Sequence, residues 1–180
     1  MTPVPLSIKV MKVYGDGELR DFALIDVALS KERFVASRAI WDMETVFEVF
    51  LTRAEPASIG LSSIGARLEE VSLADEGGLQ YCIADAEAPT PEDRLVLAPI
   101  APGVIPSVAI SSWRRMPDGE RISIEKRYCT VALDGERSFA VTDAQQLELE
   151  VRRDGPPIID VNLTLKVAAN QGLFNLSPGN

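Results

Sequence analysis

The sequence predicts an all-β protein, a multi-stranded antiparallel sandwich with one short helix near its C-terminal end. Three observations predict this class. Apolar and polar residues alternate over short runs, as they do in half-buried strands. Turn signals built from Gly, Asp and Pro recur roughly every 10 to 20 residues. A sustained helical period is almost absent. Residues 1–180 are expected to form a single domain, because no internal repeat or change of composition marks a boundary.

The first half of the chain carries a series of strand-like runs. The sequence "YGDG" at 14–17 ends the first of them in a turn, and "ADEGG" at 74–78 is expected to join the last two as a hairpin. A Ser/Gly-rich segment at 55–70 separates them from the earlier strands and is expected to be a loop. The runs lie at residues 6–13, 22–30, 34–41, 46–52, 68–73 and 79–84.

Prolines shape the middle of the chain. Pro99, Pro102 and Pro106 follow an apolar run at 95–98, and they favour an extended edge or a crossover over a helix. A meander is expected after them, with a hairpin turn at Asp134-Gly135. Its strand-like runs lie at residues 107–113, 121–133, 136–141 and 146–152.

One helix is expected at the end of the chain, from Leu163 to Gln171. Asn162 or Asp160 would serve as its N-cap. Gly172 would stand just past its C-terminus, where glycine is favoured.

Composition and charge exclude several classes of function. A net charge of −9 disfavours nucleic acid and anionic membrane surfaces as partners. The chain contains no histidine, which removes the commonest general base, the Ser-His and Cys-His pairs and the His-containing zinc sites, and no metal site is expected. Cys82 and Cys129 are expected to be reduced and buried, and the chain is expected to be cytoplasmic, because no membrane span or signal peptide is seen.

The Ser/Gly segment is the first candidate binding site. Gly60 and Gly65 allow the backbone to approach a ligand closely, and Ser58, Ser62 and Ser63 add small hydrogen-bonding groups. Such a segment suits ribose, phosphate or adenine. It equally suits an ordinary tight connection, and spacing alone leaves both interpretations open.

Asp26 is the second candidate. It interrupts the apolar run "FALIDVALS" at 22–30, where an unpaired charge would be costly. Its side chain is therefore expected either to face solvent or to be held by partners. No pair of carboxylates has a spacing that forces an acid/base site, so no catalytic residue is predicted.

Four segments taken in order resemble the C-terminal β domain of ATP-NAD kinases, in the polyphosphate or ATP-NAD kinase-like branch. They are "FALIDVALS", "EPASIGLSSIGA", "LVLAPIAPGVIP" and "VALDGERSFAVTDAQQLELEV". The resemblance runs from about residue 6 to residue 174. It implies that Ser58, Ser62, Ser63 and Gly65, with Asp26, lie against a nucleotide or dinucleotide, either NAD or NADP.

The sequence also departs from that family. Ile25 and Asp26 stand where the family has Asn and Glu, and its Gly-Gly-Asp-Gly phosphate-binding segment is absent. Because phosphoryl transfer depends on such a cradle, the chain is not expected to be active alone.

Two hypotheses follow from this comparison. In the first, the domain binds a nucleotide and completes a site with a separately encoded α/β kinase domain. In the second, it is a structural subunit whose ligand site has decayed. A homo-oligomer is expected in both cases, because exposed strand edges can pair.

Overall fold

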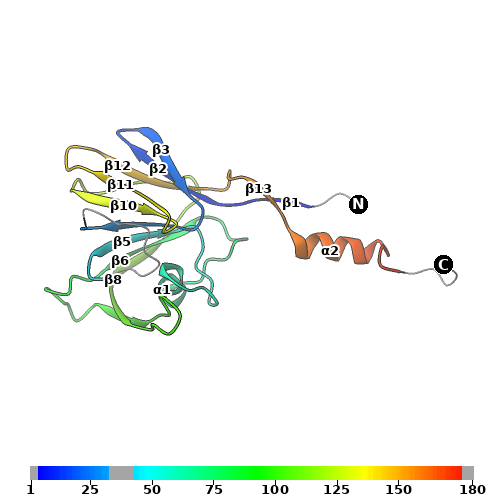
Figure 1. Ribbon diagram of the computed structural model, residues 1–180, viewed down its shortest axis with the longest axis horizontal. Coiled ribbons are helices and arrows are strands. Elements are labelled where there is room, and N and C mark those ends of the chain that lie inside the picture. The colour runs from blue at the N-terminus through cyan, green and yellow to red at the C-terminus, as the bar shows by residue number, and fades with distance from the viewer. Residues whose placement is uncertain (1–3, 33–42, 176–180) are drawn as a thin grey trace.

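The computed structural model describes residues 4–32 and 43–175. Its body is a sandwich of two antiparallel β-sheets, and a thin arm leaves the body on one side (Figure 1). The larger sheet has seven strands in the order β11-β10-β4-β5-β6-β8-β7, and the smaller has four in the order β3-β2-β12-β9. The predicted all-β antiparallel sandwich is therefore confirmed.

The strands of the larger sheet are β11 (Arg137–Val141), β10 (Cys129–Leu133), β4 (Asp26–Ser30), β5 (Val46–Leu51), β6 (Gly78–Ile83), β8 (Ser107–Met116) and β7 (Arg94–Leu97). Those of the smaller sheet are β3 (Glu18–Ala23), β2 (Val10–Gly15), β12 (Leu147–Arg152) and β9 (Arg121–Ser123). The arm contains the two-stranded ribbon β1 (Pro5–Ser7) and β13 (Pro157–Ile159), and the helix α2 (Val161–Asn170). A further helix, α1 (Leu61–Leu68), packs on the body.

The two faces of the larger sheet bury separate hydrophobic clusters. The first cluster fills the space between the two sheets and includes Val27 and Leu29 of β4. The second lies on the opposite face, where Leu61 and Ile64 of α1 cover the sheet, and includes Ala28 of β4. Alternate residues of one strand thus serve two cores, which is why the run around β4 is nearly continuous in apolar residues.

The long apolar runs expected to be single strands are divided in two. The run at 6–13 becomes β1 and β2, and the run at 22–30 becomes β3 and β4. In each case the chain leaves one sheet and enters another, so a continuous apolar sequence spans two pairing partners. The run at 121–133 is divided in the same way into β9 and β10. The strand expected at 34–41 falls on residues that lie entirely outside the described part of the chain.

The prediction that 68–73 and 79–84 pair as a hairpin is wrong, because 68–73 forms no strand of either sheet. Val71 instead forms a bridge with Ala54, with backbone N–O distances of 2.8 and 2.9 Å. The segment that follows is held by buried Lys9, whose Nζ donates to the carbonyls of Ser72 and Gly77 at 2.9 Å each. Burial lowers the pKa of Lys9 to about 8. Tertiary partners therefore replace the local pairing that the turn sequence suggested.

The C-terminal helix is confirmed. α2 spans Val161–Asn170, and its N-cap is Asp160, whose side chain accepts a hydrogen bond from the Leu163 N–H at 2.8 Å. Gly172 follows with φ of 71°, the left-handed conformation favoured just past a helix C-terminus.

The turn at Asp134-Gly135, between β10 and β11, also holds the segment that connects the two sheets. Both residues have positive φ, 52° and 68°, as an Asp-Gly hairpin turn requires. The chain crosses from β3 to β4 at Leu24 and Ile25, and the Asp134 carboxylate accepts the backbone N–H groups of Leu24, Ile25 and Asp26 at 2.7 to 3.2 Å. The Asp134 side chain thus supplies the hydrogen-bond acceptors for the backbone N–H groups at the crossing.

We expect Asp134→Ala to lower the free energy of unfolding by roughly 2–4 kcal/mol, because three backbone N–H groups lose their acceptor and alanine disfavours positive φ. Asp134→Asn, which tolerates that φ and retains one oxygen, should lose about half as much. Urea denaturation measures both. Equal stability of the alanine variant and the native chain would contradict this account of the crossing.

Candidate functional site

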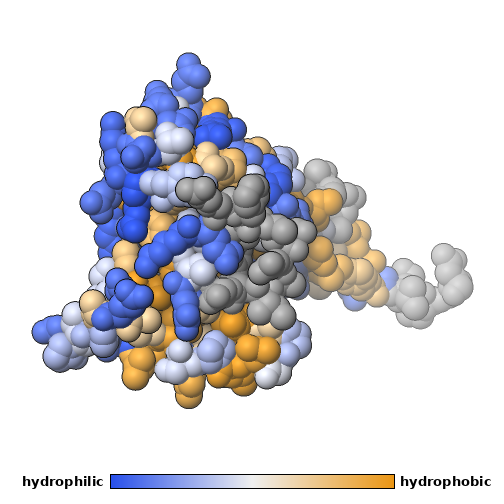
Figure 2. Space-filling view, turned by 60° about the vertical axis from the view of Figure 1, so that its left-hand side comes forward, coloured by the Kyte–Doolittle hydropathy of each residue, from blue (hydrophilic) through white to orange (hydrophobic). Residues whose placement is uncertain are grey.

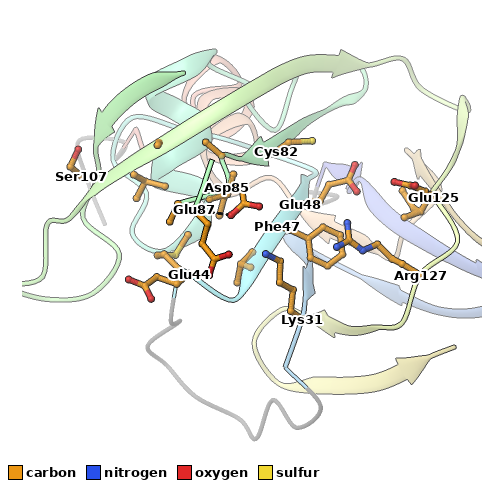
Figure 3. A pocket seen from close by; sticks show the side chains of 18 residues that line it. Lys31, Glu44, Phe47, Glu48, Cys82, Asp85, Glu87, Ser107, Glu125 and Arg127 are labelled. Atoms are coloured by element: carbon orange, nitrogen blue, oxygen red, sulfur yellow. Dashed lines mark hydrogen bonds between the residues drawn. The ribbon is translucent and has the colours of Figure 1, made fainter. Parts of the chain in front are cut away.

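A pocket of about 640 Å³ opens at one end of the larger sheet. β5 and β6 supply its floor, and the start of β8 and the connection between β9 and β10 supply its walls (Figure 3). Lys31, directly after β4, and Glu44, shortly before β5, complete it. The volume lies in the range of about 300–1,000 Å³ that is typical of small-molecule sites.

Two strand irregularities lie at this end of the sheet. The pairing of β4 with β5 shifts between Leu29 and Ser30, so that Phe47 is an extra residue on β5. The pairing of β6 with β8 shifts between Cys82 and Ile83, beside the same pocket. A bulge bends a strand and redirects a side chain, and here the bulge on β5 brings Phe47 to the pocket lining.

An arginine stacks on an aromatic ring in the pocket. The Arg127 guanidinium carbon lies 4.2 Å from the centroid of the Phe47 ring, within the range of a cation–π contact. Figure 3 shows these two side chains together, with Lys31 reaching toward the same ring. The stack presents a flat surface and a fixed positive charge to the pocket.

Carboxylates outnumber cations in the lining. Glu48 lies on β5 next to Phe47, and its Oε1 accepts a hydrogen bond of 2.5 Å from Gln80 Nε2. Burial raises the pKa of Glu48, while the hydrogen bond from Gln80 and the charge of Arg127 oppose that rise. The acidic lining residues are Glu44, Glu48, Asp85, Glu87 and Glu125, and the basic ones are Lys31 and Arg127.

This arrangement favours a ligand rich in hydrogen-bond donors. Ionised carboxylates only accept hydrogen bonds, so hydroxyl and amino groups are their natural partners. The Phe47–Arg127 stack can hold a flat ring, and Lys31 with Arg127 can neutralise an anionic group. Among residues 4–32 and 43–175, no group of three or more Cys, Asp or Glu side chains is arranged to hold a metal ion.

The Ser/Gly segment predicted to be a loop is in part a helix, which corrects that prediction. α1 begins at Leu61, directly after Gly60, whose φ is 84°. Ser63 Oγ donates to the carbonyl of Gly60 at 2.7 Å and lies 3.0 Å from that of Pro99. The segment was expected to be a loop because Ser and Gly are weak helix formers, and burial of Leu61 and Ile64 outweighs that preference.

Gly65 serves packing in this structure. A Cβ at this position would lie 2.4 Å from Leu51 Cδ1, 3.1 Å from Leu79 Cδ2 and 3.2 Å from the Ala54 Cβ. The absence of a side chain therefore lets α1 lie close to β5 and β6. The ligand contact predicted for Gly65 has no support in this geometry.

Ser58 and Ser62 occupy different environments. Ser58 is half-buried, and its N–H donates to the Glu55 carbonyl at 2.9 Å in a tight turn. Ser62 is buried, and within the described part of the chain its Oγ is the buried side-chain oxygen that lacks a hydrogen-bond partner. Neither residue lines the pocket at Phe47.

Asp26 lies at the opposite end of β4 from that pocket, since it begins the strand whose end precedes Lys31. Its pKa rises from 3.8 to about 7, because it is desolvated and because Asp134 carries a like charge nearby. Burial and, to a smaller extent, the charge of Asp26 raise the pKa of Tyr81, whose hydroxyl donates to the carbonyl of Leu61 on α1. Asp26 and α1 therefore lie on one face of the larger sheet, as the predicted site requires, but away from the pocket.

Sequence reasoning missed the pocket. Its residues come from segments scattered between positions 31 and 127, and a bulge, which pattern does not reveal, brings Phe47 to it. The one usable signal was the density of acidic residues at 85–93, which reads equally well as a solvated loop.

Together the fold and the pocket define an all-β sandwich domain with a charged cavity of ligand size. The model of the acetoin catabolism protein X C-terminal domain matches residues 9–154. The chain belongs to this family.

A relative supports the same assignment. The acetoin catabolism protein X of Cupriavidus necator is 35% identical over 169 residues, which is 94% of this chain and 46% of the relative. The chain thus spans about half the length of that relative.

The assignment to the ATP-NAD kinase family was wrong, because the family model and the relative both point to acetoin catabolism protein X. The four segments that carried the resemblance map to β3–β4, the α1 region, β7 with the following crossover, and β10–β12. They specify a sandwich and its turns, which proteins of different families share.

We expect Gly65→Ala to lower the free energy of unfolding by roughly 1–3 kcal/mol, because the new methyl group overpacks the contact between α1 and Leu51. Gly15→Ala is the matched control, since its Cβ would lie an ordinary 3.6 Å from Arg20 Cδ. Thermal or urea unfolding compares the two variants. An unchanged stability of Gly65→Ala would show that α1 does not pack in this way.

Asp26 should make stability depend on pH. Its folded-state pKa is raised, so the folded chain binds more protons than the unfolded chain between about pH 4 and pH 7, and this contribution to stability is lost as the pH rises through about 7. Asp26→Asn should therefore be more stable than the native chain at pH 8, by roughly 2–4 kcal/mol, and the gap should close by pH 4. Asp143→Asn, which removes a carboxylate at an exposed position, is the matched control. Urea denaturation from pH 4 to pH 8 is the measurement. A difference in stability between Asp26→Asn and the native chain that does not vary with pH would refute the raised pKa of Asp26.

Proposed function

We propose that this chain acts in acetoin catabolism, as the name of its relative states for that protein, and that it does so as a ligand-binding domain. Its ligand is a nucleotide or dinucleotide, held by its nucleoside part in the pocket at Phe47. The proposal concerns binding alone, because the chain spans about half of the relative and the activity of a whole protein needs the remainder.

The observation that carries the proposal is the Arg127–Phe47 stack set opposite carboxylates in a cavity of about 640 Å³. A nucleobase is a flat ring that stacks on such a surface, and ribose hydroxyls are donors that carboxylates accept. Lys31 and Arg127 supply the positive charge that a phosphate needs. Acetoin itself, a four-carbon hydroxyketone, offers neither a ring nor a charge and would fill little of this cavity.

NAD and NADP were predicted from the resemblance to ATP-NAD kinases, which was wrong, so they stand beside ATP as nucleotides to test and not as preferred ligands. A cytoplasmic location is proposed as well, and within the described residues neither helix has the length and apolar character needed to cross a membrane.

Isothermal titration of the chain with ATP, NAD, NADP and acetoin tests the proposal. We expect at least one nucleotide to bind, and Arg127→Met to weaken that binding about tenfold, since a cation–π contact and a phosphate contact are lost together. Arg20→Met is the matched control, because Arg20 stacks on Phe139 at 3.9 Å outside the pocket. Absence of heat with every nucleotide, or equal affinities of the two variants, would overturn the proposal.

A second candidate function is a structural role in an assembly. The observation that favours it is the apolar arm, which the body of the protein leaves uncovered.

A further inference from the structure

The arm carries apolar side chains that nothing in the described structure covers. α2 lies apart from both sheets, at the end of the β1–β13 ribbon (Figure 1). Figure 2 shows hydrophobic residues gathered along this arm. The large apolar residues that are at least 40% exposed there are Ile158, Ile159, Val161, Leu163, Leu165, Leu173 and Phe174.

The helix has an apolar stripe that is wider than its covered part. Thr164 and Ala168 are 8% and 1% exposed and form the covered centre of the stripe. At about 100° per residue, Val161 and Leu165 flank this centre on one side and Leu163 flanks it on the other, so the stripe extends over roughly 200°. These flanking side chains are 61%, 49% and 43% exposed.

The attachment of the arm is slight and local. Val4 N donates to Thr164 Oγ1 at 3.1 Å, and Asp160 N donates to the Val4 carbonyl at 3.0 Å. These hydrogen bonds fix the helix to its own ribbon and leave the apolar flanks open. A helix with so wide an apolar surface is normally buried, so its surroundings in the working protein should supply a groove.

The comparisons indicate what supplies that groove. The match to the C-terminal domain model ends at residue 154, so α2 lies beyond the matched segment. The match to the relative takes in 169 of the 180 residues and therefore includes α2 up to at least Ala169, whichever end is left out. The relative thus has residues that align with this helix, together with a further half of its own chain that this chain does not match.

We propose that α2 and β13 form a docking arm for a second, separately folded domain, the one built by the part of the relative that this chain does not match. That domain would present an apolar groove to Leu163 on one side of the helix and to Val161 and Leu165 on the other. Lys166 is the one charged residue of α2 and lies on its polar face, so the rim of the groove would be neutral or acidic there.

The arm is nearly neutral, in contrast to the rest of the protein surface. The chain as a whole carries a charge of −9, which opposes the approach of a second copy. The exposed edge strand β7, with Leu95 and Leu97 at 71% and 65% exposure, is another apolar area but lies on the sandwich body, within the domain model. It provides a matched control for the arm.

Hydrogen exchange on this chain and on the full-length relative tests the proposal. In this chain alone, the amides of α2 should exchange rapidly. Light scattering should show a monomer, in contrast to the homo-oligomer expected from the sequence. In the full-length relative, the segment aligned with α2 should exchange at least tenfold more slowly. Aspartate placed there at the position aligned with Leu165 should restore rapid exchange, whereas aspartate at the position aligned with Leu95 should not.

Two outcomes would overturn the proposal. The first is equally rapid exchange in the relative and in this chain, which would mean that the arm docks on no second domain. The second is a dimer of this chain that Leu165→Asp converts to a monomer, which would make a second copy the occupant. Leu165 is 49% exposed, so its substitution should leave the unfolding transition of the sandwich unchanged, and urea denaturation checks this.

Discussion

The fold depends on one crossing, where the chain passes from the smaller sheet to the larger at Leu24 and Ile25. Backbone N–H groups at such a crossing leave one ladder before joining the next, and each would be costly if left unpaired. The Asp134 carboxylate accepts three of them in succession and so fixes the angle at which β4 enters the larger sheet. Because β4 contributes Val27 to one core and Ala28 to the other, both hydrophobic clusters depend on that angle. The same arrangement buries a second carboxylate, Asp26, near Asp134, and both the burial and the like charge raise the pKa of Asp26.

The two ends of β4 have different physical characters. At the Asp26 end the chain is held by backbone pairing and buried polar groups, and α1 closes the outer face. At the Lys31 end, bulges interrupt the ladders and the sheet opens into the pocket. A regular sheet leaves no room for a ligand between its side chains, whereas a bulge redirects one residue without unpairing the neighbouring strands. The pocket therefore lies where the sheet is least regular, and the crossing lies where the sheet is most constrained.

Sequence predicted the parts of this fold that local chemistry decides. Alternation located most strands, the Asp-Gly pair located a hairpin, and Asp160 with Gly172 bounded the C-terminal helix. The errors arise where distant partners decide. α1 forms because Leu61 and Ile64 are buried on the sheet, and 68–73 stays out of the sheet because Val71 pairs with Ala54 and Lys9 holds the next carbonyls. The pocket and its stack join residues that are far apart along the chain, so no spacing could reveal them. The family was misassigned for a related reason, since the same turn and loop motifs occur in sandwich domains of different families.

The body and the arm differ in whether they can bury their own apolar surface. The body closes its own cores, and its pocket is lined by residues 31–127, none of which belongs to the arm. Ligand binding at Phe47 should consequently require only the sandwich. The arm cannot bury its own surface, because β13 has three residues and α2 ten, which is too few to form a core without a partner. Its stability in water must therefore come from whatever covers it, so in the longer relative the order of this helix and the association of the two domains should be a single cooperative property.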